Sequence, residues 1–128
     1  MLEFIIEAED HLNAVEALLL KNSGKFSLPD VDTLFRAVHS IKGASSYFNL
    51  IEINKTSQAL ENLLDEVRDG KCKMEEELKQ LTLRYIDLQR KLMKSAKSVM
   101  QNERELIYDD ASREFLFQLY AYREQKKS

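Results

Sequence analysis

The sequence predicts an all-α protein, an antiparallel four-helix bundle with an additional C-terminal helix. Only three glycines and one proline occur in 128 residues, so the chain offers few of the turn residues that a sheet needs. Apolar residues recur every three or four positions in five stretches, which is the period of a helix with one buried face. The length suits one domain with one core. We expect the bundle within residues 1–100 and a helical extension that packs on it within residues 101–128.

The first helix is expected from Leu2 to about Lys21. Acidic residues fill the gaps between its apolar positions, and the segment Asn22-Ser23-Gly24 ends it. The predicted buried stripe consists of Ile5, Ala8, Leu12, Val15, Leu18 and Leu19.

The second helix begins with a strong start signal. Ser27 can cap the helix, Pro29 fits the first turn, and Asp30 stands where a capping box has its second partner. The helix is expected to end near Asn49. Its predicted buried face consists of Val31, Leu34, Phe35, Val38, Ile41, Ser45 and Phe48.

Two longer helices follow. The third is expected from about Ile51 to Asp69, where Gly70 stops it, and the fourth from about Met74 to Met100. The third has an apolar stripe of Ile53, Thr56, Leu60, Leu63, Leu64 and Val67. The fourth has one of Leu78, Leu81, Tyr85, Leu88, Leu92, Ala96 and Val99.

A fifth helix can start at Asp109 and Asp110, whose side chains can cap it. Its apolar residues are Phe115, Leu116, Leu119, Tyr120 and Tyr122. Two interpretations stay open: the helix packs on the bundle as an extra element, or its aromatic side chains form a surface that docks a partner.

His39 is the candidate reactive residue. It lies about a quarter-turn from the centre of the second helix's apolar face, so one ring edge can be held by the protein while the other meets solvent. Lys42 and Gly43 follow one turn later, and they bring one positive charge and very little bulk. A partner could therefore approach the ring closely. His11, by contrast, is expected to be an ordinary surface residue of the first helix.

The run His39-Ser40-Ile41-Lys42-Gly43 resembles the H-x-x-K-G phosphorylation motif of histidine phosphotransfer (HPt) domains. The similarity is greatest to the N-terminal phosphotransfer domain of CheA-type chemotaxis histidine kinases, and it continues through SQALENLLDEVRDGK at positions 57–71. It covers roughly Leu2 to Ala96. Gln58 stands where CheA-like domains often have a histidine, and Ser57 replaces the commoner threonine.

The resemblance implies a role for each residue of the site. His39 would be the phosphoacceptor, attacking through Nε2, and Glu61 would orient it by accepting a hydrogen bond from Nδ1. Lys42 would supply positive charge to the phosphoryl oxygens. The residues expected at the partner-docking surface are Arg36, Gly43, Ser46 and Gln58.

Several classes of function are not expected. A formal net charge of −3 gives no attraction to nucleic acid or anionic lipid. No apolar run approaches the roughly 20 residues of a membrane span, and the start of the chain lacks the features of a signal peptide, so a cytoplasmic location is expected. Cys72 is the single cysteine and the two histidines are far apart, so neither an internal disulfide nor a metal site is predicted.

The predicted function is that of a phosphoryl carrier in two-component signalling. His39 would accept phosphate from the ATP-binding domain of a histidine kinase and pass it to an aspartate of a response-regulator receiver domain. The three scattered glycines form no nucleotide-binding loop, so no cofactor is expected on this chain, and ATP and Mg would be bound by the partner kinase domain. The isolated domain is expected to be a monomer. The alternative is a helical-bundle interaction module without phosphotransfer, which binds through the aromatic C-terminal helix.

Overall fold

The computed structural model describes residues 2–21, 26–48, 50–73, 75–100 and 109–126. Over these ranges the chain forms five helices and no strand. They are α1 (Leu2–Lys21), α2 (Leu28–Tyr47), α3 (Ile51–Arg68), α4 (Glu76–Met100) and α5 (Asp109–Lys126). The predicted all-α fold is confirmed.

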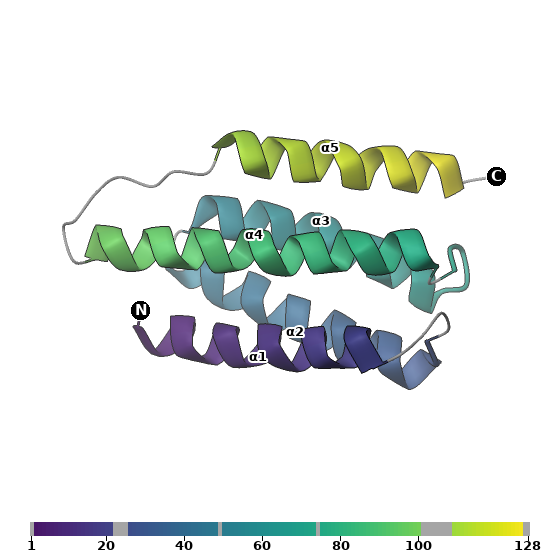
Figure 1. Cartoon of the computed structure of the whole chain (residues 1–128), viewed down its shortest axis with the longest axis horizontal. Coiled ribbons are helices and arrows are strands. Elements are labelled where there is room, and N and C mark those ends of the chain that lie inside the picture. Colours follow the sequence, from purple (N-terminus) through teal and green to yellow (C-terminus); the bar gives the residue numbers. More distant parts are fainter. Residues whose placement is uncertain (1, 22–25, 49, 74, 101–108, 127–128) are drawn as a thin grey trace.

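The first four helices form the bundle, and α5 lies on its outside. Each of α1, α2, α3 and α4 packs against two others of this group, which closes the bundle, and α5 packs against α3 and α4 (Figure 1). The most extensive contact joins α2 to α3, which run antiparallel and are connected by a short turn. This pair carries the candidate site.

The helix ends follow from local hydrogen bonds. The predicted capping box at the start of α2 is present: Ser27 Oγ accepts from the Asp30 backbone N–H, and the Asp30 carboxylate accepts from the Ser27 N–H. At the end of α3, Gly70 has φ +79°. The Gly70 and Lys71 N–H groups close back onto carbonyls of the last turn, a Schellman arrangement that favours glycine.

The core is built from the predicted stripes. Nearly all of their members are buried, together with residues that the stripes did not include, such as Phe4, Ile86 and Met93. Leu18, Phe35, Phe48 and Leu116 lie at stripe edges and are only partly buried. The side chain of Val99 lies outside the described residues. Two boundaries differ slightly from prediction: α2 ends at Tyr47 and α4 begins at Glu76.

The fifth helix uses its aromatic residues mainly for packing. Phe115, Leu119 and Tyr122 are buried, and Arg123 Nε donates to Glu66 on α3. Phe117 and Tyr120, in contrast, are 74% and 66% exposed. The first of the two interpretations, a helix that packs on the bundle, therefore describes most of this helix. None of the described helices is both long and apolar enough to cross a membrane.

A buried polar contact fixes how α4 sits on α3. Ser57 Oγ and Tyr85 Oη are 2.6 Å apart, and Gln89 Nε2 donates to Thr56 Oγ1 at 2.8 Å. All four residues are buried. Because a buried hydroxyl without a partner is costly, these bonds favour one register of the two helices.

We predict that Ser57→Ala and Tyr85→Phe each lower the free energy of unfolding by about 1–3 kcal/mol, because each leaves a buried hydroxyl unpaired. The double variant should lose clearly less than the sum of the two, since neither hydroxyl then remains. Urea unfolding of the wild type, the two single variants and the double variant gives the coupling energy between the two hydroxyls. Purely additive losses would show that this hydrogen bond has no energetic weight.

Candidate functional site

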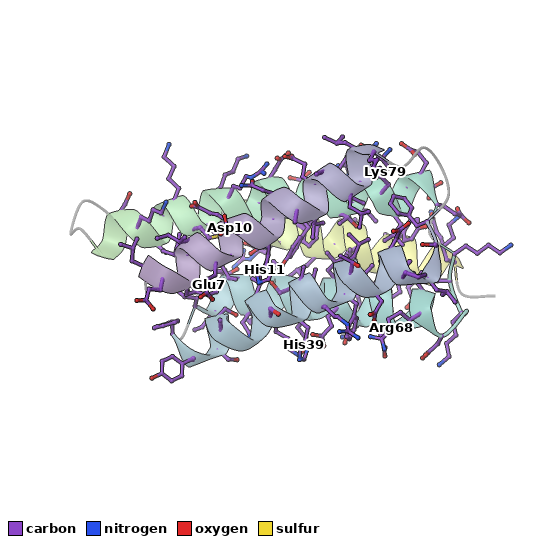
Figure 2. The ribbon with its side chains drawn as sticks, turned by 90° about the horizontal axis from the view of Figure 1, so that it is seen from below. Glu7, Asp10, His11, His39, Arg68 and Lys79 are labelled. Carbon is purple, nitrogen blue, oxygen red and sulfur yellow. The ribbon has the colours of Figure 1, made fainter. Side chains whose placement is uncertain are left out.

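The site lies where α2 and α3 face each other near the middle of the bundle. His39 on α2 and Glu61 on α3 meet across the helix pair, and His39 Nδ1 is 2.6 Å from Glu61 Oε2. The His39 side chain is 59% exposed, whereas that of Glu61 is 11% exposed. Figure 2 shows His39 on the outside of the bundle, along the same edge as Arg68. One ring edge is thus held by the protein and the other is open to solvent.

Glu61 is held by two donors, one on each oxygen. His39 contacts Oε2, and Lys42 Nζ donates to Oε1 at 2.9 Å. Burial by itself raises the pKa of Glu61, but the hydrogen bonds and charges of Lys42 and His39 outweigh it, so the pKa is lowered from its usual value of 4.5. Glu61 is therefore a carboxylate at neutral pH.

The charge of Glu61 fixes the tautomer of His39. An ionised carboxylate can only accept hydrogen bonds, so Nδ1 of the neutral ring must carry the proton and donate it. Nε2 then keeps its lone pair. A half-exposed imidazole with an unprotonated Nε2 is a nucleophile that an external electrophile can reach.

Lys42 is placed differently from the simplest expectation. The sequence predicted that its ammonium would serve phosphoryl oxygens, but in this structure Nζ is engaged with Glu61, and its side chain is 21% exposed. Lys42 is thus one turn from His39 on α2, and its ammonium group binds the Glu61 carboxylate. Its phosphoryl-binding role stays a prediction.

The four residues predicted for partner docking all lie on α2 or α3. Arg36 is exposed and pairs with Asp32, and Gln58 donates to Asn62. Ser46 is exposed and accepts from Asn54. Gly43 is exposed, and a Cβ built there meets nothing within 4 Å. Their role in docking stays a prediction.

Three residues beside the His39 ring were not predicted from the sequence. Phe35 was assigned to the core, but it is partly buried and its ring is stacked with that of His39. Arg68 lies over the Phe35 ring, and Asp32 pairs with Arg68. The available signal was the i, i+4 spacing of Phe35 and His39 on one helix face.

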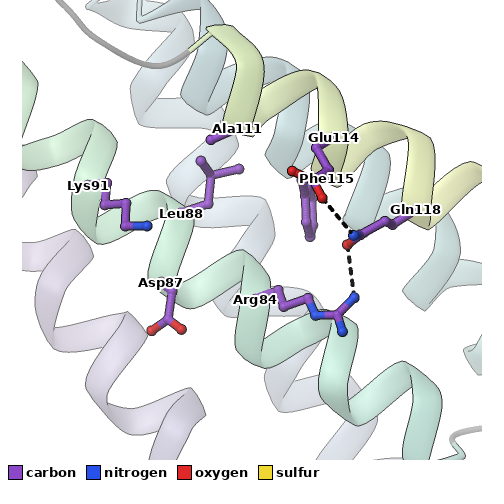
Figure 3. A pocket seen from close by; sticks show the side chains of 8 residues that line it. All are labelled: Arg84, Asp87, Leu88, Lys91, Ala111, Glu114, Phe115 and Gln118. Atoms are coloured by element: carbon purple, nitrogen blue, oxygen red, sulfur yellow. Dashed lines mark hydrogen bonds between the residues drawn. The ribbon is translucent and has the colours of Figure 1, made fainter.

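A groove between α4 and α5 lies apart from His39. Its volume is about 400 Å³, and Arg84, Glu114, Phe115 and Gln118 lie in its lining (Figure 3). Arg84 donates to Gln118, and Gln118 donates to Glu114. These polar side chains are therefore bonded to one another rather than directed at a ligand.

Comparison with known proteins identifies this class of bundle. A family model described as "Hpt domain" matches residues 1–98. The chain is 34% identical over 95 residues to the chemotaxis protein CheA of Rhizobium meliloti (strain 1021), covering 73% of this chain and 12% of that protein. It is 32% identical over 105 residues to CheA of Klebsiella aerogenes, covering 80% of this chain and 16% of that one. The chain thus spans less than a fifth of the length of these relatives.

A solved structure is similar over nearly the whole chain. It is the phosphorylated P1 domain of CheA3 in complex with CheY6 from R. sphaeroides, with a TM-score of 0.83, 25% identity, and coverage of 97% of this chain and 94% of that one. The chain belongs to the Hpt domain family. Within that family, its matched relatives are CheA proteins and a CheA P1 domain.

The lowered pKa of Glu61 predicts that the free energy of unfolding depends on pH. Because its folded-state pKa is lowered, Glu61 contributes stability that is present above the unfolded value of about 4.5 and is lost as pH falls through the lower folded value. We therefore predict that the wild-type chain loses more free energy of unfolding than Glu61→Gln between neutral pH and acid pH.

Urea unfolding curves over this pH range measure the free energy of unfolding of each variant. Glu7→Gln, at an exposed position of α1, is the matched control and should follow the wild type. Equal acid losses in wild type and Glu61→Gln would contradict a lowered pKa at Glu61.

Proposed function

We propose that this chain is a phosphoryl carrier in two-component signalling of the chemotaxis type. His39 accepts a phosphoryl group on Nε2 from a histidine kinase and passes it to an aspartate of a response-regulator receiver domain. The observation that carries the proposal is the half-exposed His39 ring whose Nδ1 donates to the buried Glu61. Membership of the Hpt family supports it, and the solved relative is a phosphorylated P1 domain in complex with CheY6.

The geometry suits both transfer steps. In the first, the Nε2 lone pair attacks the γ-phosphorus of ATP, the bond from phosphorus to the bridging oxygen breaks, and ADP leaves. Nδ1 keeps its proton, so the ring becomes cationic, and the Glu61 carboxylate at 2.6 Å offsets that charge. In the second, an aspartate oxygen attacks the phosphorus, the bond to Nε2 breaks, and the neutral ring is recovered.

This assignment makes the chain a substrate and carrier rather than a complete kinase. ATP and Mg would be bound by the ATP-binding domain of the kinase, and the docking surface would be the α2 face around Gly43 and Ser46. The open space at Gly43 lets a partner's reacting atoms come within about 3–3.5 Å of Nε2. The cytoplasmic location and the monomeric state of the isolated domain stay predictions of the sequence.

We predict that His39→Gln abolishes phosphorylation and leaves the bundle folded, because half of the ring is exposed; loss of its bond to the Glu61 carboxylate should lower the free energy of unfolding by no more than about 3 kcal/mol. The measurement is incubation with a CheA-type ATP-binding domain and labelled ATP, followed by a test for acid-labile, base-stable phosphate. His11→Gln, also at an exposed position, should be phosphorylated normally. A phosphorylated His39→Gln chain would refute the assignment.

Gly43 and Ala121 provide a matched pair that locates the docking face. Gly43→Glu places bulk and charge one turn beyond His39, where a Cβ meets open space, so the bundle should stay folded but lose transfer by orders of magnitude. Ala121→Glu places the same side chain on an exposed position of α5, close in sequence to Phe117 and Tyr120, and transfer should be unchanged.

Circular-dichroism melts of both variants show whether the bundle stays folded, and their phosphorylation rates show which face docks the partner. Gly43→Ala should stabilise α2 by about 0.5–1 kcal/mol and retain transfer. If Ala121→Glu blocks transfer while Gly43→Glu does not, partners dock on α5, which is the second interpretation of the fifth helix.

A further inference from the structure

Two aromatic rings lie together beside the reactive edge of the bundle. The rings of Phe35 and His39, one turn apart on α2, have centroids 6.0 Å apart and planes that differ by only 9°. That separation lies within the range of about 4.5–7 Å in which aromatic pairs interact. Phe35 is partly buried, whereas the His39 side chain is 59% exposed. The better-packed ring therefore gives the more exposed one a fixed neighbour.

Phe35 is itself held from the neighbouring helix. The guanidinium carbon of Arg68 lies 4.1 Å from the centre of the Phe35 ring, a cation–π contact. Asp32, one turn before Phe35, forms a long ion pair with Arg68, with its Oδ1 3.9 Å from Arg68 Nη1, and its other oxygen pairs with Arg36. These contacts join the last turn of α3 to α2, two turns beyond the Glu61 contact.

The Glu61 hydrogen bond alone does not define the direction of Nε2. It sets the distance from Nδ1 to Glu61 Oε2, but joint changes of the two side-chain torsions of His39 can keep this distance while they turn the ring plane, and Nε2 moves with the ring. A parallel ring beside the imidazole restricts this rotation. Transfer needs the lone pair aligned with the phosphorus at close approach, so a restricted plane favours reaction.

We propose that Phe35 is a positioning residue for His39, and that Arg68 fixes Phe35 in place for this purpose. The proposal rests on the phosphoryl-carrier function and extends it: Glu61 sets the tautomer and one edge of the ring, and Phe35 sets the plane. Phe35 touches neither phosphate nor partner in this role. It acts by limiting where Nε2 can point.

A set of substitutions separates this role from packing and from docking. Phe35→Leu keeps an apolar side chain but removes the flat face, and Phe35→Tyr keeps the ring. Phe48→Leu is the matched control, because Phe48, the C-cap residue of α2, is also a partly buried aromatic but pairs with Phe4 and Tyr47. Arg68→Gln removes the cation that lies over Phe35 and leaves the Phe35 ring unchanged.

Two measurements are made on each variant. Three-bond couplings from the His39 Hβ protons to Cδ2 and Nδ1, recorded by NMR on the unphosphorylated chain, report whether the ring plane keeps one orientation about the Cβ–Cγ bond. Phosphorylation rates are measured with a CheA-type ATP-binding domain and with phosphoramidate, a small donor that has no docking surface. With phosphoramidate, Nε2 attacks phosphorus, the phosphorus–nitrogen bond of the donor breaks, and ammonia leaves.

We expect Phe35→Leu to average the couplings and to slow both reactions by about three- to tenfold, the scale of one aromatic contact. The loss should appear in kcat, with the KM for the kinase domain unchanged. Phe35→Tyr should keep the wild-type phosphorylation rate. The rate of Arg68→Gln should lie between those of wild type and Phe35→Leu. Phe48→Leu should have the wild-type couplings and the wild-type rate.

Other results overturn the inference or the function beneath it. Unchanged couplings in Phe35→Leu, averaged couplings with an unchanged rate, or a loss seen only as a higher KM would each refute positioning by Phe35. A wild-type chain that takes up no phosphate, while Phe35→Leu still averages the couplings, would refute the carrier function and leave the ring contact standing.

Discussion

One buried carboxylate between two helices determines how this site is built. Glu61 accepts from His39 on one oxygen and from Lys42 on the other, and both donors come from α2. These bonds keep its pKa below the usual value although burial opposes this. An ionised Glu61 requires a proton on His39 Nδ1 and leaves Nε2 free. The same group links α2 to α3 and prepares the nucleophile.

The rest of the bundle holds α2 and α3 in the register that this contact needs. The capping box at Ser27 starts α2, and the left-handed Gly70 ends α3. Behind α3, the Ser57–Tyr85 and Thr56–Gln89 bonds lock α4 in place, and α5 covers α3 and α4. The side of α2 that bears His39 and Gly43 stays open. A packed helix pair therefore presents the imidazole, as the proposed carrier function requires.

The fold could be predicted because it follows from apolar spacing along single helices, and the central pair could be predicted because its two segments resemble those of the histidine phosphotransfer family. Apolar periodicity gave the five helices, and the His39 motif followed by the Glu61 helix indicated the hydrogen bond between them. Contacts that depend on the relative rotation of α2 and α3 could not be read in this way. The bond from Lys42 to Glu61 was not predicted, nor was the stacking of Phe35 beside His39 under Arg68. A helical period says which face is apolar, not which partner an edge residue meets.

The most direct test of this account is the protonation pattern of the His39 ring. Its two ring nitrogens can be distinguished by their ¹⁵N chemical shifts in the neutral protein, and the phosphorylated nitrogen can be identified by the same means after transfer. The account predicts that Nδ1 carries the proton of the neutral ring and that phosphate is found on Nε2. It also predicts that Glu61→Ala mixes the two tautomers. A neutral ring with its proton on Nε2, or phosphate on Nδ1, would contradict the role of Glu61 as the group that prepares His39.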